Sequence, residues 1–472
     1  MSSIRQILKL IETSLATLEE TCASTGLQIP DLNSPFTPSS EEFRTVPEAA
    51  LAANIASAAA LQLAAILTPP HVSLYHVVGG HYRSAAARVC LESHVTEILR
   101  EAGPQGLHVN DIAAMNGQDP GKLGRFLRFL AVNHVYREVS PDVFANTRIS
   151  SMLDTLKPSA DVISDPENKF DGARVGLPSH LGHHLDEAFK ASAYVWETLS
   201  DPQTGHSGEP TATPFRRAFG TKDTVWQFFA RPEEKYRQRR FDAGMQSIQA
   251  LQPAEAIFDA YDWKDLAPDS IVVDVGGGVG ASAFPLAREF PALRLVVQDR
   301  ANVIEDAKKL WKTKMPEAVD TGRVQFEVHD FFEAQPKRDV SIFLLKRILH
   351  DWSDEYAAKI LRRLREAATT KTKLILVDTI ISYACRQPYS ENDERVPGAM
   401  PIEAPEPLLA NFGAVSEIAF HIDMAMLALY NGQDRTFHHL QCLLRQCGWA
   451  LTMVHRDRRD NTFLQGMEAV PI

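Results

Sequence analysis

The feature that most constrains the fold is a glycine-rich turn between a strand pattern and a helix pattern. Residues 271–275 read Ile-Val-Val-Asp-Val, and Gly-Gly-Gly-Val-Gly follows at once in 276–280. Residues 281–290 then have helical character. Glycines let the backbone approach a ligand closely, and the N-terminus of a helix offers free N–H groups to it. The order of strand, turn and helix therefore predicts an α/β domain with a small-molecule site at the turn.

The glycine spacing alone leaves the class of ligand open. Gly276, Gly278 and Gly280 give G-x-G-x-G after Asp274, whereas a dinucleotide fingerprint reads G-x-G-x-x-G. The next strand pattern ends in Asp299, where a carboxylate is placed to accept hydrogen bonds from ribose hydroxyls. A glycine turn without a ligand, and Asp299 as a simple helix cap, is the alternative at this point.

Short β-branched runs alternate with amphipathic segments from residue 270 onward, which indicates a mainly parallel sheet. Several polar residues follow these runs directly. In open α/β sheets, ligands bind beyond the carboxyl ends of the strands. We therefore expect four side chains to converge at one edge of the sheet: Asp299, Asp330, Lys346 and His350.

His350 is the natural candidate for a general base, because the unperturbed pKa of imidazole lies near neutral pH. Asp378 ends the next strand pattern, and Asp434 follows a helix pattern over 418–430, so both acids could flank the ring. A carboxylate on one ring nitrogen fixes the tautomer and stabilises the imidazolium. The alternative is that His350 only caps or packs under the helix that begins near Ser353, with both acids exposed at the ends of elements.

The N-terminal region is predicted to be helical. One helical face repeats over Ile4, Leu8, Ile11, Leu15 and Leu18. The apolar run 49–67 is mostly alanine and is interrupted by Asn54, Ser57 and Gln62, so we expect a buried or interfacial soluble helix and not a membrane span. Such helices need a second surface, which a partner subunit would provide.

Residues 84–155 follow the pattern of a winged helix. A helix pattern over 89–99 ends near Gly103, two more helix patterns follow, and a hairpin is predicted over 135–145. This fold often binds DNA, but the second helix carries only a modest basic set: Lys122, Arg125 and Arg128. We therefore favour a dimerising role.

Residues 160–250 are predicted to be helical, with a mostly buried aromatic set: Tyr194, Trp196, Phe215, Phe219, Trp226, Phe228, Phe229 and Phe241.

Composition narrows the class of protein further. The 472 residues include 49 Lys and Arg against 60 Asp and Glu, a net charge of −11, which disfavours non-specific binding to nucleic acid or anionic membranes. The five cysteines are scattered and indicate a reducing compartment, with Cys442 and Cys447 expected to be core thiols. Charged residues interrupt any apolar N-terminal segment, so no signal peptide is expected and a cytoplasmic protein of two or three domains is predicted.

Taken together, these motifs resemble the class I S-adenosylmethionine-dependent small-molecule O-methyltransferases of the caffeate/flavonoid type, with fungal-looking loops. The resemblance is sharpest over 273–280 and over Leu-His-Asp-Trp-Ser-Asp at 349–354, and it extends from near residue 84 to the C-terminus. It implies a Rossmann-like, mainly parallel methyltransferase sheet and a mainly helical N-terminal dimerisation domain containing a winged helix. The implied division is a helical dimerisation segment (1–83), a winged-helix-like dimerisation domain (84–155), a helical linker and acceptor-site cap (156–250) and a catalytic domain that binds S-adenosylmethionine (251–472).

The resemblance also implies the roles of individual residues. The cofactor S-adenosyl-L-methionine would be held by Asp274, Gly276, Gly278, Asp299, Arg300, Asp330, Phe331 and Lys346. His350 would be the base, with Asp378 and Asp434 where plant members carry glutamates that are longer by one methylene. Met245 would contact the acceptor, and Trp352 would be a packing residue.

The implied reaction is methyl transfer to a phenolic hydroxyl of a small aromatic acceptor, carried out by a homodimer. We expect no metal, because the histidine takes the proton, and we expect the histidines at 180, 183 and 184 to face solvent. The Pro-rich acidic stretch 384–412 resembles an insertion, for which disorder is favoured over a lid. Two alternatives stay open: a catalytically inactive cofactor-binding regulator that uses the winged helix on DNA, and an N- or C-methyltransferase.

Overall fold

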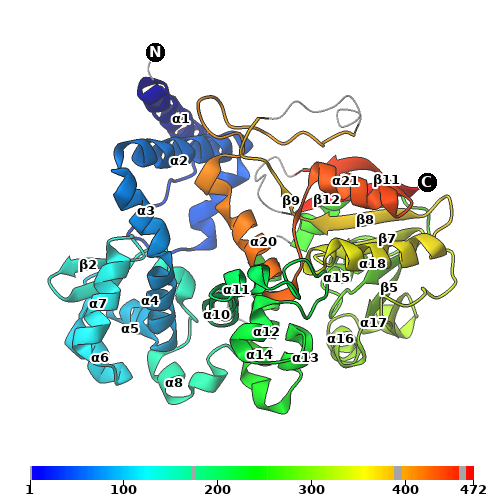
Figure 1. Ribbon diagram of the computed structural model, residues 1–472, viewed down its shortest axis with the longest axis horizontal. Coiled ribbons are helices and arrows are strands. Elements are labelled where there is room, and N and C mark those ends of the chain that lie inside the picture. The colour runs from blue at the N-terminus through cyan, green and yellow to red at the C-terminus, as the bar shows by residue number, and fades with distance from the viewer. Residues whose placement is uncertain (1–2, 173–176, 252–253, 387–395, 457–463) are drawn as a thin grey trace. The chain divides into compact units, whose positions relative to one another are not determined.

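A computed structural model describes residues 3–172, 177–251, 254–386, 396–456 and 464–472 (Figure 1). The chain divides into two compact units. The first comprises residues 1–198 and 214–252, and the second comprises residues 199–213 and 253–472.

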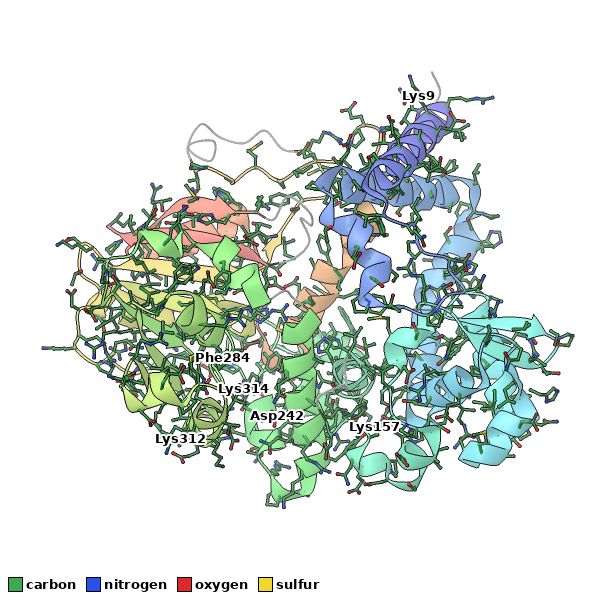
Figure 2. The ribbon with its side chains drawn as sticks, turned by 180° about the vertical axis from the view of Figure 1, so that it is seen from behind. Lys9, Lys157, Asp242, Phe284, Lys312 and Lys314 are labelled. Carbon is green, nitrogen blue, oxygen red and sulfur yellow. The ribbon has the colours of Figure 1, made fainter. Side chains whose placement is uncertain are left out.

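The first unit begins with α1 (Ser3–Thr25) and α2 (Pro47–Leu67), which lie side by side (Figure 1). Small alanine side chains of α2 let the two helices approach closely, and they bury Leu18 and Cys22 of α1. The predicted stripe is wrong in part, because Ile4 and Leu15 are exposed. Lys9 extends from α1 into solvent (Figure 2).

Helix α2 is buried on one face only. It and the helical stretch 413–430 are the two described segments long and apolar enough to cross a membrane by length and composition. The next helix, α3 (Pro70–Val78), exposes Leu74 by 62%, Tyr75 by 75% and Val77 by 77%. The first unit therefore carries a band of uncovered apolar side chains along these two helices.

A small module of four helices and three strands follows. Its elements are α4 (Gly80–Glu92), α5 (Val95–Ala102), β1 (Leu107–His108), α6 (Val109–Asn116), α7 (Pro120–Ala131), β2 (Tyr136–Ser140) and β3 (Val143–Asn146). The predicted hairpin is present as the antiparallel pair β2 and β3. The single helix predicted over 89–99 is wrong, because the left-handed backbone of His94 (φ 59°) separates α4 from α5.

Further helices, most of them short, complete the first unit. They are η2 (Ser150–Leu153), α8 (Ser159–Ser164), η3 (Pro166–Asn168), α9 (Pro178–His183), the π-helical η4 (His184–Ala188), α10 (Phe189–Ser192), α12 (Pro214–Phe219), α13 (Val225–Phe229), η5 (Pro232–Glu234) and α14 (Lys235–Leu251), while α11 (Val195–Ser200) ends at the boundary. Phe215, Phe228 and Phe229 are buried as predicted. Trp196 is 74% exposed and Tyr194 is 41% exposed, so the aromatic core is smaller than predicted.

The solvent-facing position expected for the three histidines is wrong for His183. Its side chain is buried, and its Nδ1 lies 2.9 Å from Oε2 of Glu187, one helical turn further along the chain. Glu187 in turn accepts a 2.5 Å hydrogen bond from Nη2 of Arg240, which is also buried. Buried charges need such partners, and here a carboxylate and a guanidinium supply them.

The second unit is built on a seven-stranded sheet with the order β11-β12-β8-β7-β4-β5-β6. Its strands are β4 (Ile271–Val275), β5 (Arg294–Asp299), β6 (Val324–Val328), β7 (Ile342–Lys346), β8 (Lys373–Asp378), β11 (Trp449–His455) and β12 (Gln465–Pro471). The five strands from β4 to β8 are parallel to one another. Strand β12 runs antiparallel to both of its neighbours, β8 and β11. The predicted Rossmann-like, mainly parallel sheet is confirmed.

Helices cover both faces of this sheet because alternate strand residues point to opposite sides. Helices α18 (Asp354–Ala367) and α21 (Phe437–Gln446) pack on the face that carries Val273 and Phe343 (Figure 1). Helices α15 (Ala283–Glu289) and α16 (Ala301–Lys314) pack on the face that carries Val272 and Ile342. Phe284 and Lys314, labelled in Figure 2, lie on these last two helices, with Lys314 Nζ 6.0 Å from the Phe284 ring centre.

Residues 199–213 belong to the second unit although both neighbouring segments belong to the first. Ser353 Oγ donates to the carbonyl of Gly208 at 2.8 Å, and Tyr356 donates to Glu209 at 2.8 Å. Asn431 donates to the carbonyl of Ser207 at 2.7 Å. No pattern in the sequence singles out this segment.

The Pro-rich stretch is ordered over 396–412, which corrects the expectation of disorder there. Val396 and Ala399 are buried in the sheet core, and Arg456 donates to the carbonyl of Gly398 at 2.7 Å. A side chain on Gly398 would collide with the backbone of Val454, so the stretch packs tightly on β11. Residues 387–395 lie outside the described part of the chain.

The cysteine predictions are met in part. Cys22, Cys90, Cys442 and Cys447 are free thiols, in keeping with the reducing compartment that the sequence predicts. Cys447 is buried as a core thiol, but Cys442 is exposed, because it lies on the outer face of α21.

Candidate active site

The glycine turn is present, and its backbone is left-handed at three positions. Gly276, Gly278 and Gly280 have φ values of 66°, 59° and 83°, in the left-handed region that glycine adopts readily. A side chain on Gly280 would lie 2.7 Å from Nε1 of Trp311, so this position also demands glycine for space. The surroundings of Gly278 are open, since a side chain there would meet no atom within 4 Å.

The carboxylate of Asp299 is tied to this turn. Its Oδ2 accepts from the backbone N–H of Gly278 at 2.9 Å, and its Oδ1 accepts from the N–H of Arg300 at 2.7 Å. The predicted neighbours lie close by: Phe331 lies 3.5 Å from the position of a side chain on Gly276, and Asp330 accepts from the N–H of Phe332 at 3.0 Å. The side chain of Arg300 is exposed.

Asp274, which is buried, and Lys346, which is half-buried, carry opposite charges beside the turn. Burial raises the pKa of Asp274 to about 7, against the attraction of Lys346, which lowers it. Burial lowers the pKa of Lys346 to about 8. Within the described residues, Oδ2 of Asp274 is buried and accepts no hydrogen bond. A buried acceptor without a donor is costly, so this oxygen is suited to a polar ligand group.

His350 lies in the turn η8 (Leu349–Asp351), directly after β7, and the structure brings both predicted acids to it. Nδ1 of His350 lies 3.5 Å from Oδ1 of Asp434 and 3.8 Å from Oδ1 of Asp378. These are ion-pair distances, longer than a good hydrogen bond. In the described part of the chain, both carboxylate oxygens of Asp434 and Oδ1 of Asp378 are buried without a hydrogen bond.

A third carboxylate, which sequence reasoning missed, lies on the other side of the ring. Oδ1 of Asp351 is 3.6 Å from Nε2 of His350, and burial raises the pKa of Asp351 to about 6. Burial also raises the pKa of Asp378 to about 6. Burial lowers the pKa of His350, but the three carboxylates raise it by more, so that it stands at about 9. The imidazole is therefore a strong proton acceptor in this surrounding.

Arg435 is a second residue that sequence reasoning missed. Its buried guanidinium donates to the carbonyls of Leu349 at 2.9 Å and Trp352 at 2.8 Å, and to Oδ1 of Asp354 at 2.9 Å. These groups bracket the turn that carries His350. Arg435 directly follows Asp434 in the sequence, which was the one signal that could have pointed to it.

Trp352 and Met245 have different settings. The Trp352 ring packs edge-on against Phe332 at 4.8 Å and stacks on Tyr356 at 5.8 Å, so it is a packing residue as expected. Met245 lies on α14 of the first unit and is half-buried.

The same cluster has the composition of a cation site. Three ligand atoms lie within 4.8 Å of one another, one each from His350, Asp378 and Asp434. A metal bound there would replace the proton of the imidazole, since metals bind the neutral ring. Metal binding and a role as base therefore exclude each other at His350, and the metal-free site stays a prediction.

The chain is similar throughout its length to proteins of known activity. Residues 196–397 match the O-methyltransferase domain family. The chain is 49% identical over 471 residues to 4-O-methyltransferase 1 of Phanerochaete chrysosporium, covering 100% of this chain and 99% of that protein. The chain belongs to the O-methyltransferase family. The predicted family, enzyme class and methyl donor, S-adenosyl-L-methionine, are thereby confirmed.

Solved structures support the fold. The structure of the O-methyltransferase NcsB1 from neocarzinostatin biosynthesis, in complex with S-adenosylmethionine and 2-hydroxy-5-methyl naphthoic acid, has a TM-score of 0.57, 20% identity and coverage of 83% of this chain and 96% of that one. A structure described as a pericyclic reaction enzyme has a TM-score of 0.64, 15% identity and coverage of 98% and 100%. The fold is thus shared between different chemistries, and the activity must be argued from the site.

The turn in the second unit fits the methyl donor. S-adenosylmethionine carries an ammonium group, a carboxylate, ribose hydroxyls and a sulfonium. The buried acceptor of Asp274, the open backbone at Gly278 and the carboxylate of Asp299 offer what those polar groups need.

Proposed function

We propose that the enzyme methylates a phenolic hydroxyl of a small aromatic acceptor and that His350 is the general base. One observation carries the proposal: a largely buried imidazole follows β7 with three carboxylates around it, in the same unit as the glycine turn. The NcsB1 complex, which contains a hydroxynaphthoic acid, supports an aromatic acceptor by analogy.

The chemistry follows from proton affinities. A phenol has a pKa of about 10, like tyrosine, and is a weak nucleophile at neutral pH until it loses its proton. His350 takes that proton as the phenol oxygen attacks, and Asp378 and Asp434 stabilise the imidazolium from the Nδ1 side. This arrangement leaves Nε2 for the acceptor, with Asp351 beside it. S-adenosylmethionine, when bound, supplies the methyl group.

We assign the cofactor contacts to the eight residues predicted from the sequence, because they gather around one turn. Asp299 holds the turn and accepts from the ribose, and Asp274 accepts from the ammonium group. Phe331 packs over Gly276 and Asp330 lies beside it, where the adenine would bind. Met245 of the first unit remains the proposed acceptor contact.

The test is methyl transfer by His350→Ala, measured by mass spectrometry on a panel of phenols. We expect a loss of about 100-fold or more, the usual contribution of a positioned base. His421→Ala is the matched control, since His421 is an exposed histidine on α20 (Glu417–Tyr430). Calorimetry with S-adenosylhomocysteine checks that both variants still bind cofactor. A rate for His350→Ala within a few-fold of the parent would remove the assignment of the base.

Two other activities fit the same fold. An N- or C-methyltransferase would place the label from methyl-labelled cofactor on a different atom, which product analysis identifies. A regulator without catalysis would bind DNA through the proposed winged helix, and a negative gel shift at low salt would exclude it. The cluster around His350 favours the enzyme over the regulator.

We also propose that a second copy of the chain covers the apolar band on α2 and α3, which makes the enzyme a homodimer in the cytoplasm. The exposed side chains Leu74, Tyr75 and Val77 support this, because monomers seldom expose such contiguous patches. Light scattering at micromolar concentration is expected to give twice the chain mass. Val77→Asp is expected to lower it towards one chain, and a monomeric parent would contradict the proposal.

A further inference from the structure

One charged side chain of the site has no part in the reaction described so far. Arg347 follows β7 immediately, three residues before His350, and its backbone N–H donates to the carbonyl of Val377 at 3.0 Å. This bond sets Arg347 beside Asp378, at the carboxyl ends of two neighbouring parallel strands. Arg347 has a φ of 54°, which is uncommon for a residue with a side chain. Such strained residues gather at functional sites, where the surrounding structure holds them.

Two consecutive cations divide between the two halves of the site. Lys346 is attracted by Asp274 beside the glycine turn. Arg347 is attracted by Asp351, Asp378 and Asp434, the acids that surround the base. Successive side chains leave a strand in opposite directions, which explains the division. Arg347 thus places a permanent positive charge on the side of the site where the acceptor reacts.

The guanidinium of Arg347 makes no direct ion pair with the three aspartates that attract it. Among the residues that the structure describes, it makes no hydrogen bond and no ion pair within 4 Å, although it is half-buried. By contrast, the guanidinium of Arg435 donates several hydrogen bonds to the turn of His350 and to Asp354. A guanidinium has five N–H donors in a planar fork that matches a carboxylate. The nitrogens of Arg347 are not fully buried, so a ligand can reach them, and a carboxylate would accept hydrogen bonds from two of them at once.

We propose that Arg347 binds a carboxylate of the acceptor, so that the enzyme selects phenolic acids over neutral phenols. The inference rests on the proposed function for the phenolic nature of the acceptor. A bidentate pair between guanidinium and carboxylate would fix the ring and direct its hydroxyl towards His350. Arg347 would also offset the repulsion that the three aspartates exert on an anionic acceptor.

A purely structural role makes a different prediction. If Arg347 only balances the charge of the aspartates, its removal alters the base, and acids and neutral phenols suffer alike. If it binds the carboxylate, its removal affects acids alone and acts mainly on KM. The comparison of a phenolic acid with its own amide separates the two cases, since the pair differs in charge and hardly in shape.

The experiment measures kcat/KM for hydroxybenzoates and hydroxycinnamates, each paired with its primary amide, in parent, Arg347→Gln and Arg347→Lys. We expect the parent to prefer the acid by about 10- to 100-fold, the range of one charge-assisted contact. Arg347→Gln is expected to bring that ratio near one with the amide rate retained, and Arg347→Lys to restore part of it. Arg294→Gln, which removes an exposed arginine at the amino end of β5, is the control and keeps the parental ratio.

The outcomes are distinct from those of the proposed function. Equal rates on acids and amides in the parent, or an equal loss on both in Arg347→Gln, overturn the inference and leave phenol methylation standing. Calorimetry with the same acids and S-adenosylhomocysteine gives a readout without turnover. Binding of the acid that depends on Arg347 supports the inference even where no phenol is methylated, which would overturn the proposed function alone.

Discussion

The two units each bury a cluster of charges, and the clusters differ in how closely their members pair. In the first unit, Nη2 of Arg240 lies 2.9 Å from Asp186 and 2.5 Å from Glu187, and His183 lies 2.9 Å from Glu187. Despite burial, which raises it, the pKa of Asp186 is held well below its usual value by its cationic partners, foremost Arg240. Close pairing of this kind favours one fixed arrangement.

In the second unit, the carboxylates around His350 lie 3.5 to 3.8 Å from its ring nitrogens. Burial raises the pKa of Asp351 and of Asp378, so neither acid is held in its charged form by a tight partner. A cluster with open acceptors and loosely held protons can bind a ligand or exchange a proton, whereas the first cluster can do neither without breaking. This is the difference expected between a cluster that stabilises a fold and one that performs chemistry.

The largest expected effect is on the free energy of unfolding, when the charge cluster of the first unit is disrupted. Arg240→Met leaves two buried carboxylates without their main partner, which costs about 3 to 5 kcal/mol. Asp434→Asn removes a buried charge that has no hydrogen bond, so its cost is expected to be below about 1 kcal/mol. Urea unfolding of both variants measures the two costs. Equal losses would show that the clusters do not differ in the way described.

The second effect is on the pH dependence of catalysis. The carboxylates raise the pKa of His350, and the neutral ring is the form that takes a proton, so the parental rate should rise as the pH approaches about 9. Asp434→Asn removes one of these charges and should shift that rise to lower pH. The plateau rate should fall about tenfold, since the imidazolium is less stabilised. Rates for one acceptor across pH 6 to 10 test this, and an unmoved profile would show that Asp434 does not act on the base.

A third effect tests whether Arg435 positions the base. Arg435→Lys keeps the charge but cannot reach both carbonyls of the turn and Asp354 together. We expect kcat to fall about tenfold with KM for the cofactor unchanged. Arg365→Lys, which alters a guanidinium bonded to the carbonyls of Gly448 and Ile472, is the control. A parental kcat for Arg435→Lys would mean that the turn holds its shape unaided.

The smallest effect is on stability as a function of pH. The pKa of His350 is raised above its unfolded value of about 6.5, so its contribution to stability is fully present below pH 6.5 and is lost as the pH rises through about 9. The difference between the free energies of unfolding at pH 7 and pH 10 should therefore be smaller in His350→Gln than in the parent, by about 1 kcal/mol or more. The sign is the test, since a larger pH dependence in the variant would contradict the raised pKa.

Local patterns predicted the parts of the molecule that local forces determine. The strand at 271–275, the glycine turn after it and the carboxyl-end positions of Asp299 and His350 follow from residue types at short spacing. The sequence predicted a mainly parallel sheet but not the order of its strands, because the partners of a strand are distant in sequence.

Two of the errors share a physical cause, which is contact with residues distant in the sequence. His183 looked polar and exposed, but Glu187 and Arg240 make its burial possible. Arg435 was missed because the carbonyls to which it donates, those of Leu349 and Trp352, lie more than eighty residues away in the sequence. Tertiary contacts of this kind leave no periodic signal in the sequence.

The placement of residues 199–213 limits how the chain of such an enzyme can be divided or recombined with that of a relative. The chain passes between its two units at three points, near residues 198, 213 and 252, so no single cut separates them. A fragment that begins at 253 would lack the carbonyls that accept from Ser353 and Asn431, which lie beside the turn of His350 and the loop of Asp434. Exchange of the first unit between relatives by one crossover near residue 252 would therefore also exchange residues 199–213, which belong to the second unit. New specificities are expected to arise by substitution within the intact chain.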